Sequence, residues 1–190
     1  DEEDFNNNTF KNLVSWTDTK VNGELIDKWT NLTLLNTLDM DGDKGAINKI
    51  KRYKNDLFLF QDTAIANILF NTRTQITTNE STPIQIANSG KVDGKIYIND
   101  IVGCINKWSI VVAESGLWFI DDITKGIYNF SDKFTCVSDE LGFHSWINQQ
   151  SSPTKFTPKS FDQAIINNTS ANIPMKSFIS YYDKINGDIF

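Results

Sequence analysis

The strongest constraint on the fold is a series of three short apolar segments separated by two polar corners. The segments are residues 108–113, 117–121 and 127–130. Aromatic and β-branched residues in runs of this length favour β-strands, and glycines in the corners supply the positive φ angles of tight turns. This part of the chain therefore predicts three consecutive antiparallel strands, a β-meander.

The same pattern occurs earlier in the chain. Residues 55–62 align with residues 115–122, and residues 64–68 align with residues 125–128. A third start, residues 182–190, stops at the last residue of the sequence. Repetition of one supersecondary unit indicates a repeat architecture. We therefore predict an all-β fold of repeated antiparallel meanders, and a chain that is cut before the repeats end.

Residues 57–60 read Leu-Phe-Leu-Phe, which is apolar on both faces of a strand and predicts a strand covered on both sides. Residues 46–53 are expected to be the first strand of the earlier meander, and residues 73–76 its fourth. Residues 133–137 are the expected fourth strand of the later meander. The side chains expected to pack between neighbouring sheets are Leu57, Phe58, Phe60, Leu117, Trp118, Phe119 and Ile127.

The N-terminal segments are less regular. Residues 13–16 and 25–29 are separated by Asn-Gly, which predicts a hairpin. Residues 32–38 fit either a strand or one helical turn. Period-two alternation at residues 84–86 and 96–98 indicates edge strands.

Charge and composition exclude several classes of function. The net charge of −6 and the pI of about 4.7 argue against general nucleic-acid binding, which needs clustered Lys and Arg. Residues 49–54 are locally basic, but alternation sends only half of their side chains to one face, as in a solvated strand. No apolar run has the length that crosses a bilayer. Cys104 and Cys136 are either free thiols packed like small apolar residues or a disulfide.

Three carboxylates at alternate positions, Asp39, Asp41 and Asp43, begin like a calcium-binding loop. An EF-hand requires Gly at the sixth position and Glu at the twelfth, where this chain has Lys44 and Ile50. The interpretation is therefore a Gly/Asp turn, with the three aspartates kept only as weak candidates for an irregular cation site. Phosphate-binding glycine motifs and zinc-ligand spacings are lacking in the sequence, so no cofactor is expected.

A catalytic site is not expected. The single histidine, His144, lies between aromatic residues, where a backbone carbonyl usually satisfies the imidazole. Asp121 and Asp122 suggest a glycosidase pair, but neighbours on one strand point to opposite faces. Recurrence of Asp at the same strand end in both repeats favours turn residues that accept backbone N–H groups.

The tryptophans are candidates for binding as well as for packing. Trp118 lies inside an apolar strand, which favours the core. Trp108 and Trp146 are the candidates for stacking on a sugar or a partner surface, and His144 is a third candidate for binding beside Trp146. Trp146, in a polar loop with His144 nearby, is the better of the two.

Several segments together resemble the tail nozzle, or muzzle, proteins of short-tailed, crAss-like bacteriophages. The segments that carry the resemblance are residues 45–50, 55–60, 115–121 with 125–128, and 141–146. The resemblance implies a large structural virion protein, partly a β-propeller, that forms a ring at the distal end of the tail. It implies a channel for ejected DNA and cargo proteins, and contacts to other copies and to other tail proteins. It offers no catalytic residues.

With this resemblance, we expect a flexible or partner-bound acidic arm over residues 1–12 and β-meanders or propeller blades over residues 13–150. Residues 151–177 are expected to be a linker or insertion, and residues 178–190 the truncated start of a further blade. The chain holds fewer repeats than a closed propeller, and the repeats are more widely spaced than ordinary blades. This requires either inserted segments or a piece of a longer polypeptide, and the cut ends favour the piece. The alternative functions are a propeller-type glycan-binding module and a carbohydrate-active enzyme.

Overall fold

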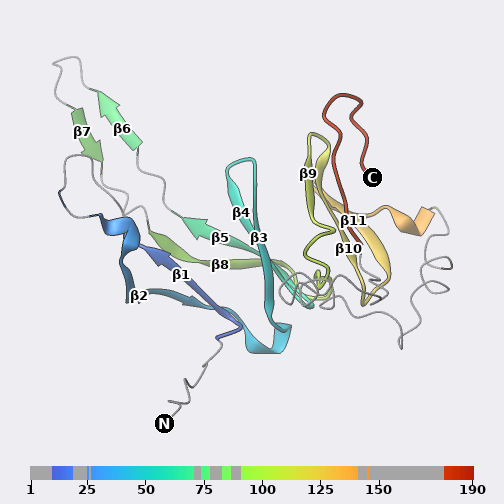
Figure 1. Ribbon diagram of the computed structural model, residues 1–190, viewed down its shortest axis with the longest axis horizontal. Helices are drawn as coiled ribbons and strands as arrows, with labels where there is room; N and C mark the ends of the chain where they lie inside the picture. The colour runs from blue at the N-terminus through green and yellow to red at the C-terminus, as the bar shows by residue number, and fades with distance from the viewer. Residues whose placement is uncertain are drawn as a thin grey trace, which may run out of the picture.

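The computed structural model describes residues 10–18, 25, 27–70, 74–77, 83–86, 91–140, 145 and 178–190. Apart from the single helical residue 145, the elements of these residues are β-strands and single-turn 3-10 helices. The strands pair antiparallel in two four-stranded and two two-stranded sheets (Figure 1). The predicted all-β, antiparallel fold class is therefore confirmed for this part of the chain.

The first four-stranded sheet contains the earlier of the two predicted meanders. Its order is β3 (Ile47–Tyr53), β4 (Asp56–Gln61), β5 (Ile65–Phe70) and β8 (Val92–Asn99). The prediction for its fourth strand is wrong, because the segment at residues 73–76 contributes to a separate hairpin. There β6 (Thr74–Thr77) pairs with β7 (Pro83–Ile86), whereas β8 pairs with β5. Alternation identifies a strand but not its partner, so both segments fitted the sequence pattern equally well.

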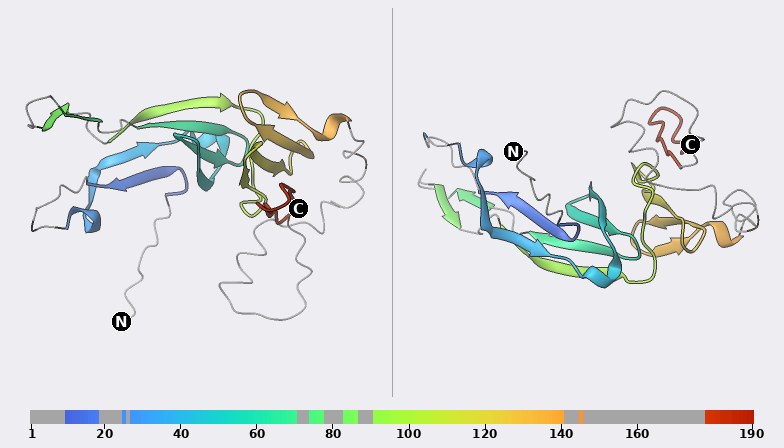
Figure 2. Two further views of the ribbon diagram at one scale, coloured as in Figure 1. Left: turned by 90° about the horizontal axis from the view of Figure 1, so that it is seen from above. Right: turned by 60° about the horizontal axis from the view of Figure 1, so that its bottom comes forward.

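The β6–β7 hairpin is an insertion between the third and fourth strands of the first sheet. All three views show it projecting from the end of the molecule opposite the second four-stranded sheet (Figures 1 and 2). An insertion at this point lengthens the spacing between the two meanders. Inserted segments were one of the two explanations that the sequence offered for this spacing.

The second four-stranded sheet is the predicted central meander. Its order is β9 (Val111–Ala113), β10 (Gly116–Asp121), β11 (Gly126–Phe130) and β12 (Phe134–Cys136). Gly116 has a φ of 143°, as its corner requires. At the second corner the positive φ of 58° belongs to Lys125 instead of Gly126. Gly126 is needed for space, because a Cβ atom there would lie 2.9 Å from the Tyr128 ring.

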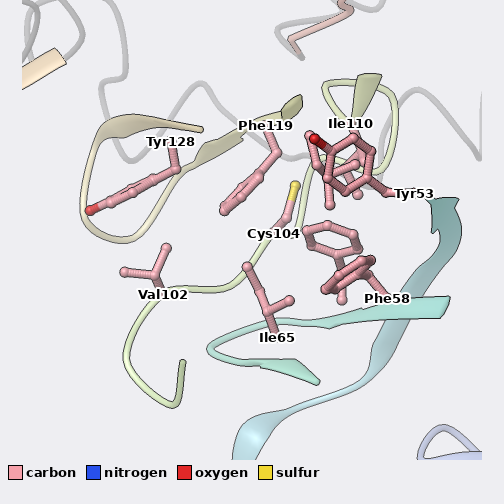
Figure 3. Close-up of a cluster of buried hydrophobic side chains, with 10 residues drawn as sticks. Tyr53, Phe58, Ile65, Val102, Cys104, Ile110, Phe119 and Tyr128 are labelled. Atoms are coloured by element: carbon pink, nitrogen blue, oxygen red, sulfur yellow. The ribbon is translucent and has the colours of Figure 1, made fainter. Parts of the chain in front are cut away.

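The two four-stranded sheets share one aromatic core (Figure 3). The rings of Phe60 and Phe119 meet edge to face with centroids 5.3 Å apart, and those of Phe58 and Phe130 do so at 5.2 Å. Each such pair contributes about 0.5–1.5 kcal/mol beyond the apolar area that it buries. Rings from both meanders therefore hold the sheets against each other.

A second core lies on the other face of β4. Its buried members are Met40, Leu59, Ala66 and Ile68, with Leu57 partly buried against them. Thus β4 is covered on both faces, as its apolar run predicted. Of the expected core residues, Leu57, Trp118 and Ile127 are only partly buried, because alternation turns them away from the aromatic core, which holds the other four.

A two-stranded sheet covers the second core. In it β1 (Leu13–Thr17) pairs with β2 (Leu32–Asp39), and Val14 and Leu38 pack on the core.

The expected pairing of residues 13–16 with 25–29 is wrong. The Asp27 carboxylate accepts a hydrogen bond from the Trp29 backbone N–H and begins the 3-10 helix η1 (Lys28–Thr30) instead. The expected Asn-Gly turn lies outside the described residues. The other 3-10 helices are η2 (Gly42–Lys44) and η3 (Ser138–Glu140).

Residues 178–190 form a short hairpin beside the second sheet (Figure 1). Tyr181 and Phe190 exchange two backbone hydrogen bonds, and Gly187 has a φ of 78° in the turn. The predicted Asn186-Gly187 turn is therefore confirmed. The Ser180 N–H donates to the Trp108 carbonyl at 3.0 Å, which ties this C-terminal hairpin to the segment before β9.

Candidate binding groove

The segment of residues 100–110 crosses from the first sheet to the second and positions Trp108. Asn99 Oδ1 accepts hydrogen bonds from the backbone N–H groups of Ile101 and Val102, both at 2.9 Å. The Cys104 N–H donates to the Gln61 carbonyl at 2.9 Å.

The Cys104 thiol is fully buried, and this burial raises its pKa to about 12. This cysteine is a packed, protonated thiol and not a nucleophile. Both cysteines are free.

A groove of about 380 Å³ lies between β3, the start of β9 and the C-terminal hairpin. Its polar and aromatic lining consists of Lys49, Lys51, Trp108, Ser180, Tyr181, Tyr182 and Lys184. Lys49 and Lys51 reach it together because residues two apart on a strand share a face. The groove therefore joins three segments that lie far apart in the sequence.

Positive charge is concentrated around the Trp108 ring in this groove. The Lys49 ammonium donates to the Lys107 carbonyl and lies 5.3 Å from the centroid of the Trp108 ring. The Lys107 ammonium lies 5.8 Å from the same ring. Burial, and then the neighbouring charge of Lys51, lowers the pKa of Lys49. A negatively charged ligand would relieve the repulsion among these ammonium groups.

Of the three side chains predicted to bind a ligand, only Trp108 is among the described residues. It lines the groove and is 39% exposed. His144 and Trp146 lie outside the described residues. A binding role of Trp108, His144 or Trp146 stays a prediction.

The three aspartates that resemble a calcium loop lie around η2. The Lys95 ammonium donates to the Asp41 carboxylate at 2.6 Å and to the Asp39 backbone carbonyl at 2.8 Å. An ammonium group thus takes the position that a cation would have beside these oxygens. Over the described ranges, no group of three or more His, Cys, Asp or Glu side chains is placed to hold a metal ion.

Asp121 anchors the corner between β10 and β11. Its carboxylate accepts hydrogen bonds from the Ile123 N–H at 2.9 Å and the Thr124 hydroxyl at 2.8 Å. Burial raises the pKa of Asp121. Asp122 instead pairs with the Lys125 ammonium at 2.7 Å. The interpretation of these aspartates as turn residues is confirmed for Asp121, and the two carboxylates have separate partners.

Sequence reasoning missed most of this groove. The alternation of Lys49 and Lys51 was visible, but a solvated strand was the simpler interpretation. The sequence around Tyr181, Tyr182 and Lys184 indicates only the start of another repeat. No local pattern indicates that a C-terminal hairpin packs beside Trp108, because the contact joins distant segments.

The fold is that of an all-β protein whose antiparallel sheets pack on a shared core. A family model described as Crassvirus muzzle protein matches residues 1–190, so the chain belongs to that family and is a structural protein of a phage virion. Over its 190 residues it is 42% identical to the muzzle protein of Bacteroides phage crAss001. The match covers the whole chain and 13% of that relative, so the chain spans a small part of the relative's length. None of the helices in the described parts of the chain is long and apolar enough to span a membrane.

Proposed function

We propose that the chain is a part of the tail nozzle, where it contributes two β-propeller blades to a ring around the distal channel of the tail. The observation that carries this proposal is the aromatic core shared by two four-stranded meanders. Propellers are built in this way, from four-stranded sheets that bury large side chains against their neighbours. Membership of the muzzle family supplies the virion context.

In this role the chain works by packing and not by chemistry. Exposed leucines, such as Leu34 at 94% and Leu35 at 92%, are available for contacts to other copies or to other tail proteins. The net charge of −6 suits a conduit for DNA and cargo proteins, because a like charge keeps the duplex from adhering to the wall. Enzymatic activity is not part of the proposal, since the Asp121 carboxylate serves its own turn.

Electron microscopy of virions tests the location. Antibodies raised against the 190-residue chain and marked with gold are expected to label the distal end of the tail. Antibodies against a capsid protein are the control for label position. Gold over the head, or along the tail without enrichment at its tip, would contradict the proposed nozzle.

The alternative is a glycan-binding module that uses Trp108 or Trp146. The half-exposed Trp108 favours it, but two ammonium groups lie within 5.8 Å of the centroid of that ring and compete with a sugar for its faces. A glycan array probed with the chain separates the two functions. Hits that Trp108→Ala or Trp146→Ala abolishes would favour the adhesin.

A further inference from the structure

The groove between β3 and the C-terminal hairpin presents positive charge above an apolar floor. The Lys51 and Lys184 ammonium groups make no hydrogen bond or ion pair with any residue that the structure describes. Ile110, Val112 and Ile179 line the same space. A ligand that complements both features carries acidic groups next to an apolar or aromatic group.

The size of the groove favours a short peptide over duplex nucleic acid. A volume of about 380 Å³ accepts a few side chains but not a duplex. An acidic peptide segment is therefore the ligand class that fits.

The chain itself contains such a segment. Residues 1–5 read Asp-Glu-Glu-Asp-Phe, four carboxylates followed by one aromatic ring. We infer that the groove binds residues 1–5 of a second copy of this chain. The carboxylates pair with Lys51 and Lys184, and the Phe5 ring packs on the apolar floor. This inference rests on the proposed ring and names a contact between its copies, of the head-to-tail kind that closes rings.

Peptide binding measures the contact directly. A fluorescent peptide of residues 1–9 is titrated with a chain in which Asp1→Asn, Glu2→Gln, Glu3→Gln and Asp4→Asn remove competition from its own arm. Saturable binding that weakens as salt is added is expected, because exposed ion pairs are screened. The double variant Lys51→Glu, Lys184→Glu is expected to lower the affinity about tenfold or more.

The matched control is the double variant Lys11→Glu, Lys133→Glu, which changes the net charge equally at two exposed lysines outside the groove lining. It is expected to bind the peptide as the parent does. Circular dichroism of each variant verifies that the fold is kept. Equal loss of affinity in the control, or equal binding of a peptide with Asn and Gln in place of the acids, would overturn the inference.

Two further experiments identify the ligand that occupies the groove. A short oligothymidylate that displaces the peptide more strongly than unlabelled peptide does would make the groove a nucleic-acid site, against the inference. Sedimentation of the parent chain is expected to show concentration-dependent association that Lys51→Glu, Lys184→Glu abolishes. The parent chain could instead be monomeric at every concentration while the peptide binds the variant with Asn and Gln at residues 1–4. Residues 1–5 would then bind the groove of their own chain, and the contact between copies would be overturned.

The two proposals fail separately. Gold label away from the tail tip, together with lysine-dependent peptide binding and association, would remove the nozzle location and leave the contact between copies. Gold label at the tail tip without peptide binding would remove the contact between copies and leave the nozzle location.

Discussion

At the scale of the residue, one aligned position holds a buried polar side chain in both meanders. Gln61 and Asp121 occupy aligned positions at the ends of β4 and β10, and both are fully buried. The Gln61 amide donates to the backbone carbonyls of Asp41 and Gly45 at 3.0 and 2.8 Å, whereas the Asp121 carboxylate accepts from its own turn. A buried polar group is tolerated where its hydrogen bonds are made. The two copies thus keep a buried polar anchor and differ in which backbone it holds.

Asp121 gives the folded chain a pH dependence. Because burial raises its pKa, the folded chain binds this proton more tightly than the unfolded chain does. The resulting contribution to the free energy of unfolding is fully present below the unfolded-state pKa of Asp and is lost as the pH rises through the raised, folded-state pKa. Asp121→Asn is expected to remove this loss. Urea unfolding at a series of pH values compares it with the parent and with the control Asp188→Asn, an exposed aspartate. Parallel pH profiles for all three chains would contradict the prediction.

At the scale of the element, the strands were predictable and several of their partners were not. The apolar runs of β4 and β10 and the glycine at the start of β10 are local signals, and they placed both meanders correctly. The partner of β5 depends on a strand that follows a long insertion, and the partner of β1 is β2 instead of residues 25–29. Local periodicity specifies which residues face the core but not which edges meet.

The crossing segment between the sheets depends on a glycine that no local sequence pattern marks. A Cβ atom on Gly103 would lie 2.4 Å from the Asp62 backbone oxygen, which has no freedom to rotate away. Gly103→Ala is therefore expected to lower the free energy of unfolding by about 1–3 kcal/mol, the usual cost of overpacking. Gly94→Ala is the matched control, since a Cβ atom there meets nothing within 4 Å. Denaturant unfolding of both variants measures the difference, and equal stabilities would show that the segment can shift.

At the scale of the whole molecule, the arrangement follows from sheets that cannot cover their own faces. One face of β4 needs the β1–β2 sheet, and its other face needs the rings of the second meander. The sequence predicted this stacking from the apolar run alone. It could not predict the groove, because Trp108 and the Tyr181–Tyr182 pair meet only after both sheets and the C-terminal hairpin have folded.

The shared core also predicts how the chain unfolds. Phe60 is fully buried in the first sheet, and its ring contacts Phe119 of the second. Phe60→Ala is expected to cost about 3–5 kcal/mol. Because the core is common, the loss should lower hydrogen-exchange protection in β4 and β10 together, in one cooperative unit. Leu35→Ala, at a side chain 92% exposed, is the control and is expected to change stability by no more than about 0.5 kcal/mol. If Phe60→Ala released the amides of β4 while those of β10 kept their protection, the two meanders would be independent sheets, and the stacking on which the proposed ring depends would have to come from elsewhere.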